Sequence, residues 1–506
     1  MTAKTLMIVG TSSSAGKSLL VTALCHSYAR RGIKVAPFKA QNMSNNAAVC
    51  PDGSEIGRAQ AVQAAAAGLE PTVDMNPILI KPEADSTSQI VVNGKPWKTL
   101  HARDYYPKKD YLWKQVTSAI DRLRAEYELV LIEGAGSPAE LNLKEGDIVN
   151  MATALYAEAP TLLVGDVDRG GIFAQLLGTY WLLPPEEQEI LKGFIVNKFR
   201  GDITLFEDGI QIIEERSGVP VFGVVPYLHD LYIPEEDAVS LEAPDPIQPV
   251  RAASVDIAVI HLPRIANFDD FDPLLAEPGV RLRYVDSPTR LGKPNAIIIP
   301  GTKSTIGDLH WLRSRGLATE IQKHVQNGGS LVGICGGYQI LGTEILDPHN
   351  VESREAQTAG LGFLPISTTF VGEKATYRAK AKIRFEESHQ FNWLCAIAGK
   401  EISGYEIHKG RTTGADPWLK IIERNQKETH DLDGAISTDG RIWGCYIHGL
   451  FGNQNLRRAW LRSLGWTPPK DAPMQDDPFA ASLTYLTDTV ESALDMQLLE
   501  KIIWES

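Results

Sequence analysis

The sequence predicts an α/β protein with two domains, each a mainly parallel, doubly wound sheet. Short apolar runs typical of buried strands alternate with helical segments along most of the chain. At 506 residues the chain is too long for one ordinary core, and the proline-containing run LEAPDPIQPVRAAS interrupts the pattern near the middle. We therefore expect a first domain at 1–240, a linker at 241–254, a second domain at 255–460, and a tail at 461–506 that packs on the second domain.

The first element is an apolar strand followed by a small-residue loop, TLMIVGTSSSAGKS at 5–18, and a helix that runs to about Arg31. Glycines and serines let successive backbone N–H groups point at phosphate oxygens, and the start of the helix adds partial positive charge. This pattern predicts a nucleoside triphosphate site in which Lys17 reaches phosphate and Ser18 reaches Mg²⁺; a chance glycine- and serine-rich turn is the alternative. The residues expected to bind ATP here are Gly10, Thr11, Gly16, Lys17 and Ser18.

A polar run, PFKAQNMSNN at 37–46, follows the second predicted strand. Its amide and ammonium donors suit a substrate rich in carboxylates and carboxamides, so Lys39, Gln41 and Asn42 are expected to bind substrate. A polar surface loop without a special role is the alternative, because Asn and Ser favour turns.

Polar residues also end three further predicted strands of the first domain. Ligands of open parallel sheets gather at the carboxyl ends of the strands. Glu133, after LVLI, and Asp166, after TLLVG, are expected to join Ser18 as magnesium ligands, and Asn197 ends the third strand. Each acid alone could instead be a helix cap.

The second domain contains SLVGICGGYQ at 330–339, in which Cys335 lies between an apolar run and glycines. Such a sequence is typical of a strand-to-helix elbow that exposes a nucleophile, since only small neighbours tolerate the sharp turn. A buried, inert thiol is the alternative reading. A thiol nucleophile usually needs a histidine base, and His448, at the end of the strand-like run RIWGCYIHG, is the preferred candidate. A second run, GYEIHKG, places Glu406 and His408 on one face.

These residues resemble the class I glutamine amidotransferase domain, in which such a cysteine attacks the carboxamide of glutamine and releases ammonia. The resemblance implies an oxyanion hole formed by the backbone around Gly336, Gly301 and Thr302. Most of that family has a glutamate two residues after the histidine, but here that position is Leu450. We therefore expect Glu406 to orient His448 in its place.

The amino-terminal loop has one residue more than the standard phosphate-binding spacing and resembles the dethiobiotin synthetase branch of P-loop proteins. That resemblance implies that Asn197 reads the adenine base. The fusion of the two domains, with KAQNMSNN and GYEIHKGRT, resembles the cobyric acid synthase family along nearly the whole chain. It implies ATP- and glutamine-dependent amidation of the b, d, e and g carboxylates of adenosylcobyrinic acid a,c-diamide.

Two other functions stay open at this point. One is a related ligase that acts on another corrinoid acid, such as cobyrinic acid at its a and c carboxylates. The other is a P-loop switch protein with a non-catalytic glutaminase domain, which Leu450 would favour.

Bulk composition excludes several other classes of function. The net charge of −13 without a basic block argues against a nucleic-acid partner, and the absence of a long apolar run argues against a membrane partner. Five cysteines without a CxxC pair argue against structural zinc or disulfides and favour a reducing cytoplasm. The expected cofactors are ATP and Mg²⁺, and the expected partners are glutamine and a corrinoid acid. A homo-oligomer of this chain stays open.

Overall fold

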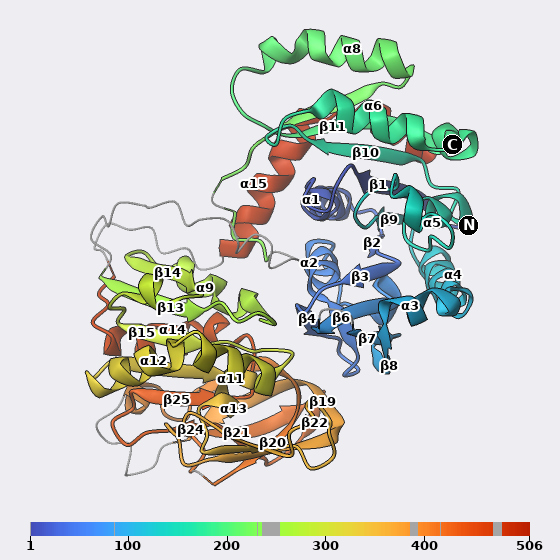
Figure 1. Ribbon diagram of the computed structural model, residues 1–506. Helices are drawn as coiled ribbons and strands as arrows, with labels where there is room; N and C mark the ends of the chain where they lie inside the picture. The colour runs from blue at the N-terminus through green and yellow to red at the C-terminus, as the bar shows by residue number, and fades with distance from the viewer. Residues whose placement is uncertain are drawn as a thin grey trace. The chain divides into compact units, whose positions relative to one another are not determined.

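The computed structural model describes residues 2–84, 87–229, 231–234, 254–384, 393–414, 416–468 and 478–505. These residues form two compact units, shown in Figure 1. The first comprises 2–44, 55–234 and 478–505, and the second comprises 45–54 and 254–468. Apart from Ser254, the predicted linker lies outside the described residues.

The first unit is built on a sheet with the strand order β12-β11-β10-β1-β9-β2, in which every pair is parallel. Its strands are nearly continuous apolar runs because helices cover both faces of such a sheet. The bounds are β1 (Lys4–Gly10), β2 (Val35–Phe38), β9 (Leu129–Glu133), β10 (Thr161–Asp166), β11 (Leu191–Phe199) and β12 (Val221–Pro226).

The helices of this unit begin with the one that the sequence predicts after the small-residue loop. They are α1 (Lys17–Arg30), α2 (Arg58–Ala66), α3 (Ala102–Tyr105), α4 (Lys109–Glu126), α5 (Met151–Tyr156), α6 (Ile172–Leu182), α7 (Pro185–Ile190) and α8 (Glu207–Ser217). A small second sheet has the order β3-β6-β7-β8. Its strands are β3 (Gln41–Met43), β6 (Ile78–Ala84), β7 (Thr87–Val92) and β8 (Lys95–His101), and β5 (Glu55–Gly57) precedes α2.

The end of the chain also belongs to the first unit, where α15 (Pro478–Ala493) and α16 (Met496–Trp504) complete the apolar core around α1. Figure 1 shows α15 running past α1, on which it packs. Arg30 of α1 pairs with Asp488 of α15 at 2.7 Å, and the backbone N–H of Asp495 donates to the carbonyl of Phe222 in β12. The expectation that the tail packs on the second domain holds for residues 461–468, whose Leu461 and Trp466 join the core of the second unit. It is wrong for residues 478–505, because their apolar face is buried against α1 and β12 instead.

The second unit contains a parallel sheet with the order β14-β13-β15-β16-β25, which the short antiparallel strand β24 extends. Its strands are β13 (Val255–Ile260), β14 (Val280–Val285), β15 (Ala296–Ile299), β16 (Ser330–Ile334), β24 (Ala435–Ile436) and β25 (Ile442–Cys445). Its helices are α9 (Asp272–Leu275), α10 (Pro288–Leu291), α11 (Thr305–Ser314), α12 (Leu317–Gln326), α13 (Gly336–Ile340) and α14 (Gln454–Ser463).

A largely antiparallel sheet forms the rest of the second unit, with a long ribbon of β19 and β20 at its centre. Its strands are β17 (Glu344–Leu346), β18 (Gln357–Ala359), β19 (Ser367–Ile383), β20 (Glu401–Thr413), β21 (Leu419–Arg424), β22 (Lys427–Glu428) and β23 (Leu432–Asp433). The short strand β4 (Ala47–Val49) also belongs to this unit. The prediction of two mainly parallel sheets is confirmed, but it did not include this ribbon.

Candidate active site

The phosphate-binding loop of the first unit lies between β1 and α1. Gly16 has a φ of +98°, a left-handed conformation that glycine adopts without strain, and α1 begins at the next residue. The ammonium of Lys17 is buried in this loop and donates to the carbonyls of Ser12 at 2.8 Å and Gly136 at 3.3 Å. The loop therefore places the lysine ammonium beside the loop backbone, at the start of α1, which is the arrangement that phosphate binding requires.

Glu133, at the carboxyl end of β9, is the centre of a buried polar cluster. It accepts hydrogen bonds from Ser18 at 2.9 Å, Lys39 at 2.8 Å and Gln63 at 2.6 Å. Burial alone would raise the pKa of Glu133, but Lys39, Gln63 and Lys17 outweigh it and hold the pKa below its ordinary value. An ionised carboxylate beside a serine hydroxyl at the start of α1 fits a Mg²⁺ ion that also binds phosphate oxygens.

Asp166 and Asn197 both make contacts within the first unit. Asp166 pairs with Lys198 at 2.9 Å and accepts the backbone N–H of Asp168, so its carboxylate is already used at the end of β10. Within the described part of the chain, no group of three or more His, Cys, Asp or Glu residues could hold a metal ion, and the role of Asp166 as a magnesium ligand stays a prediction. The amide of Asn197 donates to the carbonyl of Ala15 at 2.8 Å, so it supports the phosphate-binding loop.

The run at 37–46 spans the end of β2, the strand β3 and the residues that follow it. Lys39 and Asn42 are only 3% and 1% exposed; Lys39 binds Glu133, and Asn42 donates to Gln60 at 2.9 Å. Both side chains therefore have partners within the first unit, and their role in binding substrate stays a prediction. Gln41 stays partly exposed and accepts a hydrogen bond from the hydroxyl of Tyr105. The sequence could not reveal this because the partners of Lys39 and Asn42 lie on other elements.

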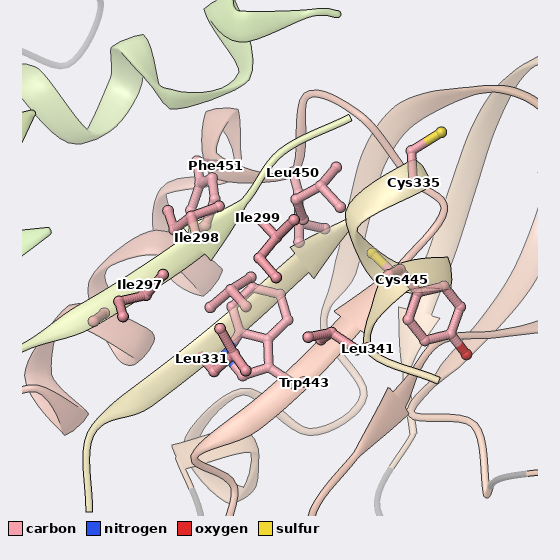
Figure 2. Close-up of a cluster of buried hydrophobic side chains, with 14 of the residues drawn as sticks. Ile297, Ile298, Ile299, Leu331, Cys335, Leu341, Trp443, Cys445, Leu450 and Phe451 are labelled. Atoms are coloured by element: carbon pink, nitrogen blue, oxygen red, sulfur yellow. The ribbon is translucent and has the colours of Figure 1, made fainter. Parts of the chain in front are cut away.

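Cys335 lies between β16 and α13, as the elbow pattern indicates. Its φ of +52° is unusual for a residue with a side chain and marks a strained turn. A Cβ atom at Gly337 would lie 1.9 Å from the carbonyl oxygen of Ile299, so the turn packs directly on β15. Figure 2 shows Cys335 at the edge of the apolar cluster with its sulfur turned away from it, whereas Cys445 lies among the buried side chains. Burial raises the pKa of the Cys445 thiol well above its ordinary value, which favours Cys335 as the reactive thiol.

His448 is held by a carboxylate that the sequence analysis missed. Its Nδ1 lies 2.6 Å from Oδ2 of Asp270, and the other oxygen of Asp270 accepts the backbone N–H of Gly449 at 2.7 Å. The ring of Tyr405 stacks on the imidazole, with the ring centroids 5.2 Å apart. Asp270 therefore fixes both the ring and the backbone that follows it. Burial alone would lower the pKa of His448, but Asp270 and the neighbouring Cys335 raise it to about 10.

Asp270 belongs to η6 (Phe268–Phe271), a short helix after β13. Leu450, at the position where the family glutamate is expected, is buried in the apolar cluster of Figure 2 with Phe451. The only sequence signal for Asp270 is the pair of acids in NFDD after the first strand of the domain.

The prediction that Glu406 orients His448 is wrong. Glu406 forms two hydrogen bonds with the guanidinium of Arg424, at 2.6 and 2.9 Å, and its other neighbour is His408 at 3.6 Å. Alternate residues of β20 lie on opposite faces of the sheet, so Glu406 and His408 share a face. On that face the carboxylate of Glu406 contacts Arg424 of β21. Burial alone would raise the pKa of Glu406, but His408 and Arg424 lower it. The carboxylate of Glu406 is therefore an ion-pair partner of Arg424.

The expected oxyanion loop lies beside the elbow. A Cβ at Gly301 would lie 2.8 Å from Cε1 of His448, and a Cβ at Gly336 would lie 3.1 Å from the backbone nitrogen of Thr302. The structure thus brings Cys335, His448, Gly301, Thr302 and Gly336 together, although they come from three segments of the chain. Backbone N–H groups next to a thiol and an imidazolium can stabilise the oxyanion of an acyl transfer.

Two family models match the chain, one for each unit. The CobQ/CobB/MinD/ParA nucleotide binding domain matches residues 6–240, and the CobB/CobQ-like glutamine amidotransferase domain matches residues 256–456. Together with the two sites, these matches define the class: a P-loop nucleotide-binding domain joined to a glutamine amidotransferase domain.

Relatives that match nearly the whole chain identify the family. The cobyric acid synthase of Chloroflexus aurantiacus is 55% identical over 99% of this chain and 100% of its own length, and that of Herpetosiphon aurantiacus is 53% identical over 99% of both. Among solved structures, PurLQS from Thermotoga maritima is 19% identical, covers 42% of this chain and 98% of its own, and has a TM-score of 0.32. The chain belongs to the cobyric acid synthase family, and it is a glutamine-hydrolysing ligase of cobalamin biosynthesis.

None of the helices in the described part of the chain combines the length and the apolar character that crossing a membrane requires.

Proposed function

We propose that this enzyme uses ATP and glutamine to amidate the b, d, e and g carboxylates of adenosylcobyrinic acid a,c-diamide, giving adenosylcobyric acid. The similarity to cobyric acid synthases over nearly the whole chain supports the overall reaction. The observation that carries the proposal is the pair of sites in one chain: the Cys335–His448–Asp270 group and the loop of Lys17 with Glu133.

The first half-reaction is the release of ammonia from glutamine. The thiolate of Cys335 attacks the side-chain carboxamide carbon, and the oxyanion that forms faces the backbone N–H groups of Gly336 and Thr302. His448 gives a proton to the departing nitrogen as the C–N bond breaks, which leaves a glutamyl thioester. Water then attacks the thioester while His448 accepts its proton, so glutamate leaves and the thiolate returns. Asp270 keeps Nδ1 of His448 protonated, so Nε2 exchanges the proton.

The second half-reaction takes place at the nucleotide site. A carboxylate resists attack by ammonia because oxide is a poor leaving group. One carboxylate oxygen therefore first attacks the γ-phosphorus of ATP, the bond from that phosphorus to the oxygen of the β-phosphate breaks, and an acyl phosphate and ADP result. Lys17 and the loop N–H groups would stabilise charge on the transferring phosphoryl group. Ser18 and Glu133 would hold Mg²⁺, which supplies further charge neutralisation at the phosphates. Ammonia then attacks the acyl carbon, the C–O bond to phosphate breaks, and an amide and inorganic phosphate result.

A panel of corrinoid acids tests the proposal. The purified enzyme is incubated with ATP, Mg²⁺, ¹⁵N-amide-labelled glutamine and either the a,c-diamide or cobyrinic acid, and the products are analysed by mass spectrometry. We expect label at the b, d, e and g positions of the a,c-diamide. Label at a and c of cobyrinic acid would instead identify the related ligase. ATP turnover without labelled product from any acid would contradict the proposal.

A further inference from the structure

Residues 45–54 connect two parts of the first unit but lie in the second unit. The chain leaves the first unit after Ser44, forms β4 and returns at Glu55. We call this segment the 45–54 strap. Because the strap follows Lys39 after only a few residues, it continues directly from the polar cluster of Glu133.

The strap binds η6 through two asparagines. Asn267 accepts the backbone N–H of Ala47 at 2.9 Å, and Asn46 accepts the backbone N–H of Phe268 at 3.3 Å. Both asparagine side chains belong to buried residues, so this reciprocal pair is shielded from water. The interaction fixes the first residues of η6 on the strap.

The turn of η6 links this contact to the glutaminase site. Asn267 has a φ of +53° and begins the turn, and its carbonyl accepts the backbone N–H of Asp270 at 3.1 Å. Asp270 is thus one hydrogen-bonded turn from the strap and in direct contact with His448. A displacement of the strap would move the carboxylate that orients the base.

The rest of the strap is fixed to the β19–β21 region. The carbonyl of Val49 accepts from Nε of Arg378 in β19 at 2.8 Å, and a Cβ at Gly53 would lie 2.3 Å from the amide nitrogen of Asn425. The strap is therefore held near both of its ends by contacts within the second unit.

We propose that the 45–54 strap is a positioning element which, through Asn46 and Asn267, holds Asp270 against His448 and couples glutamine hydrolysis to the nucleotide site. This inference rests on the proposed function. The direct covalent path from Lys39 to Asn46 is the route by which nucleotide and corrinoid binding changes the alignment of the triad.

The experiment compares the full-length wild type with Asn46→Ala and Asn267→Gly. Glycine suits the left-handed φ at position 267, so the second variant loses the side chain without adding backbone strain. Asn295→Ala is the matched control, because Asn295 also accepts a backbone N–H, from Asp256, but at the amino end of β13, away from the triad. Three rates are measured: glutamine hydrolysis alone, the same with ATP and the a,c-diamide, and synthesis with added ammonium chloride.

We expect the kcat/KM for glutamine to fall by about 10- to 100-fold in both strap variants, the loss expected from a misplaced catalytic group. The stimulation of hydrolysis by ATP and corrinoid should fall as well, and the alkaline limb of the pH profile should move to lower pH, because His448 loses its close carboxylate. Ammonia-dependent synthesis and the control variant should match the wild type.

Three outcomes would overturn the inference: wild-type glutamine hydrolysis in both strap variants, unchanged stimulation, or an equal loss of ammonia-dependent synthesis, which would indicate general misfolding. Failure of the proposed function is recognised separately, because the wild type itself would then release no ammonia from glutamine under any of these conditions.

Discussion

At the scale of single residues, the reactivity of Cys335 depends on a carboxylate that comes 178 residues before His448. Nothing in the local sequence of either residue indicates Asp270, because a triad is defined by geometry and is independent of spacing along the chain. Cys335 and His448 were predictable because each lies in a local pattern of its own. Glu406 shared a local pattern with His408, which made it the wrong choice.

Replacement of Asp270 tests this assignment. We expect Asp270→Asn to lower the kcat/KM for glutamine by about 10²- to 10⁴-fold, since the imidazole loses both orientation and charge support. Without that carboxylate, burial dominates and the pKa of His448 falls from about 10, so the imidazolium is lost at lower pH and the alkaline limb of the pH–rate profile moves down. The matched control is Glu406→Gln, which should leave that limb in place. A larger shift in Glu406→Gln than in Asp270→Asn would contradict the assignment.

A crossed pair of variants separates the two half-reactions. Cys335→Ser should abolish glutamine-dependent synthesis but keep synthesis from added ammonia, because the phosphate loop is unchanged. Lys17→Ala should abolish both, because the transferring phosphoryl group loses its lysine. Amide formation is measured by mass spectrometry of the corrinoid. Glutamine-dependent synthesis by the Cys335→Ser variant would show that another residue is the nucleophile.

At the scale of elements, glycines determine where the elbow can lie. Gly337 packs so closely on β15 that any side chain must displace backbone. Gly337→Ala should therefore lower the free energy of unfolding by about 1–3 kcal/mol, as overpacking does in other cores, and reduce glutamine hydrolysis with it. Thermal unfolding followed by circular dichroism gives the stability change. Gly372→Ala is the control, because a Cβ there has no neighbour within 4 Å, and an equal loss in both variants would contradict the packing argument.

The elements that carry the sites were largely predictable from sequence. The run at 5–18 predicts β1, the loop and α1, and the run at 330–339 predicts β16 and α13, because apolar runs flanked by glycines specify a strand, a turn and a helix locally. The strand before His448 is shorter than its alternating pattern suggests: β25 ends at Cys445, and His448 instead bridges to Tyr405. A tertiary contact with β20 ends the strand there.

At the scale of the whole molecule, the last two helices close the core of the nucleotide-binding unit. Leu486 of α15 is 1% exposed and belongs to the same apolar cluster as Leu24 of α1. We expect Leu486→Ala to destabilise this unit by about 2–5 kcal/mol, the usual cost of removing a buried leucine side chain. Hydrogen exchange of the full-length Leu486→Ala variant is compared with that of the wild type. Exchange should become faster in α1 and β12 and stay unchanged in β16 and α13.

The exposed neighbour Tyr485 provides the control, and Tyr485→Ala should change little. Faster exchange in the second unit of the Leu486→Ala variant, with the first unit unchanged, would contradict the assignment of the tail.

The sequence by itself determined the two α/β domains, the phosphate-binding loop and the elbow with its cysteine. Each of these features is encoded in consecutive residues whose spacing determines the backbone. Tertiary structure alone decided that Asp270 orients His448, that Lys39 pairs with Glu133, that the 45–54 strap joins the second unit and that α15 and α16 return to the first. These features depend on which surfaces meet after folding, and residues far apart in sequence carry no local mark of their partners.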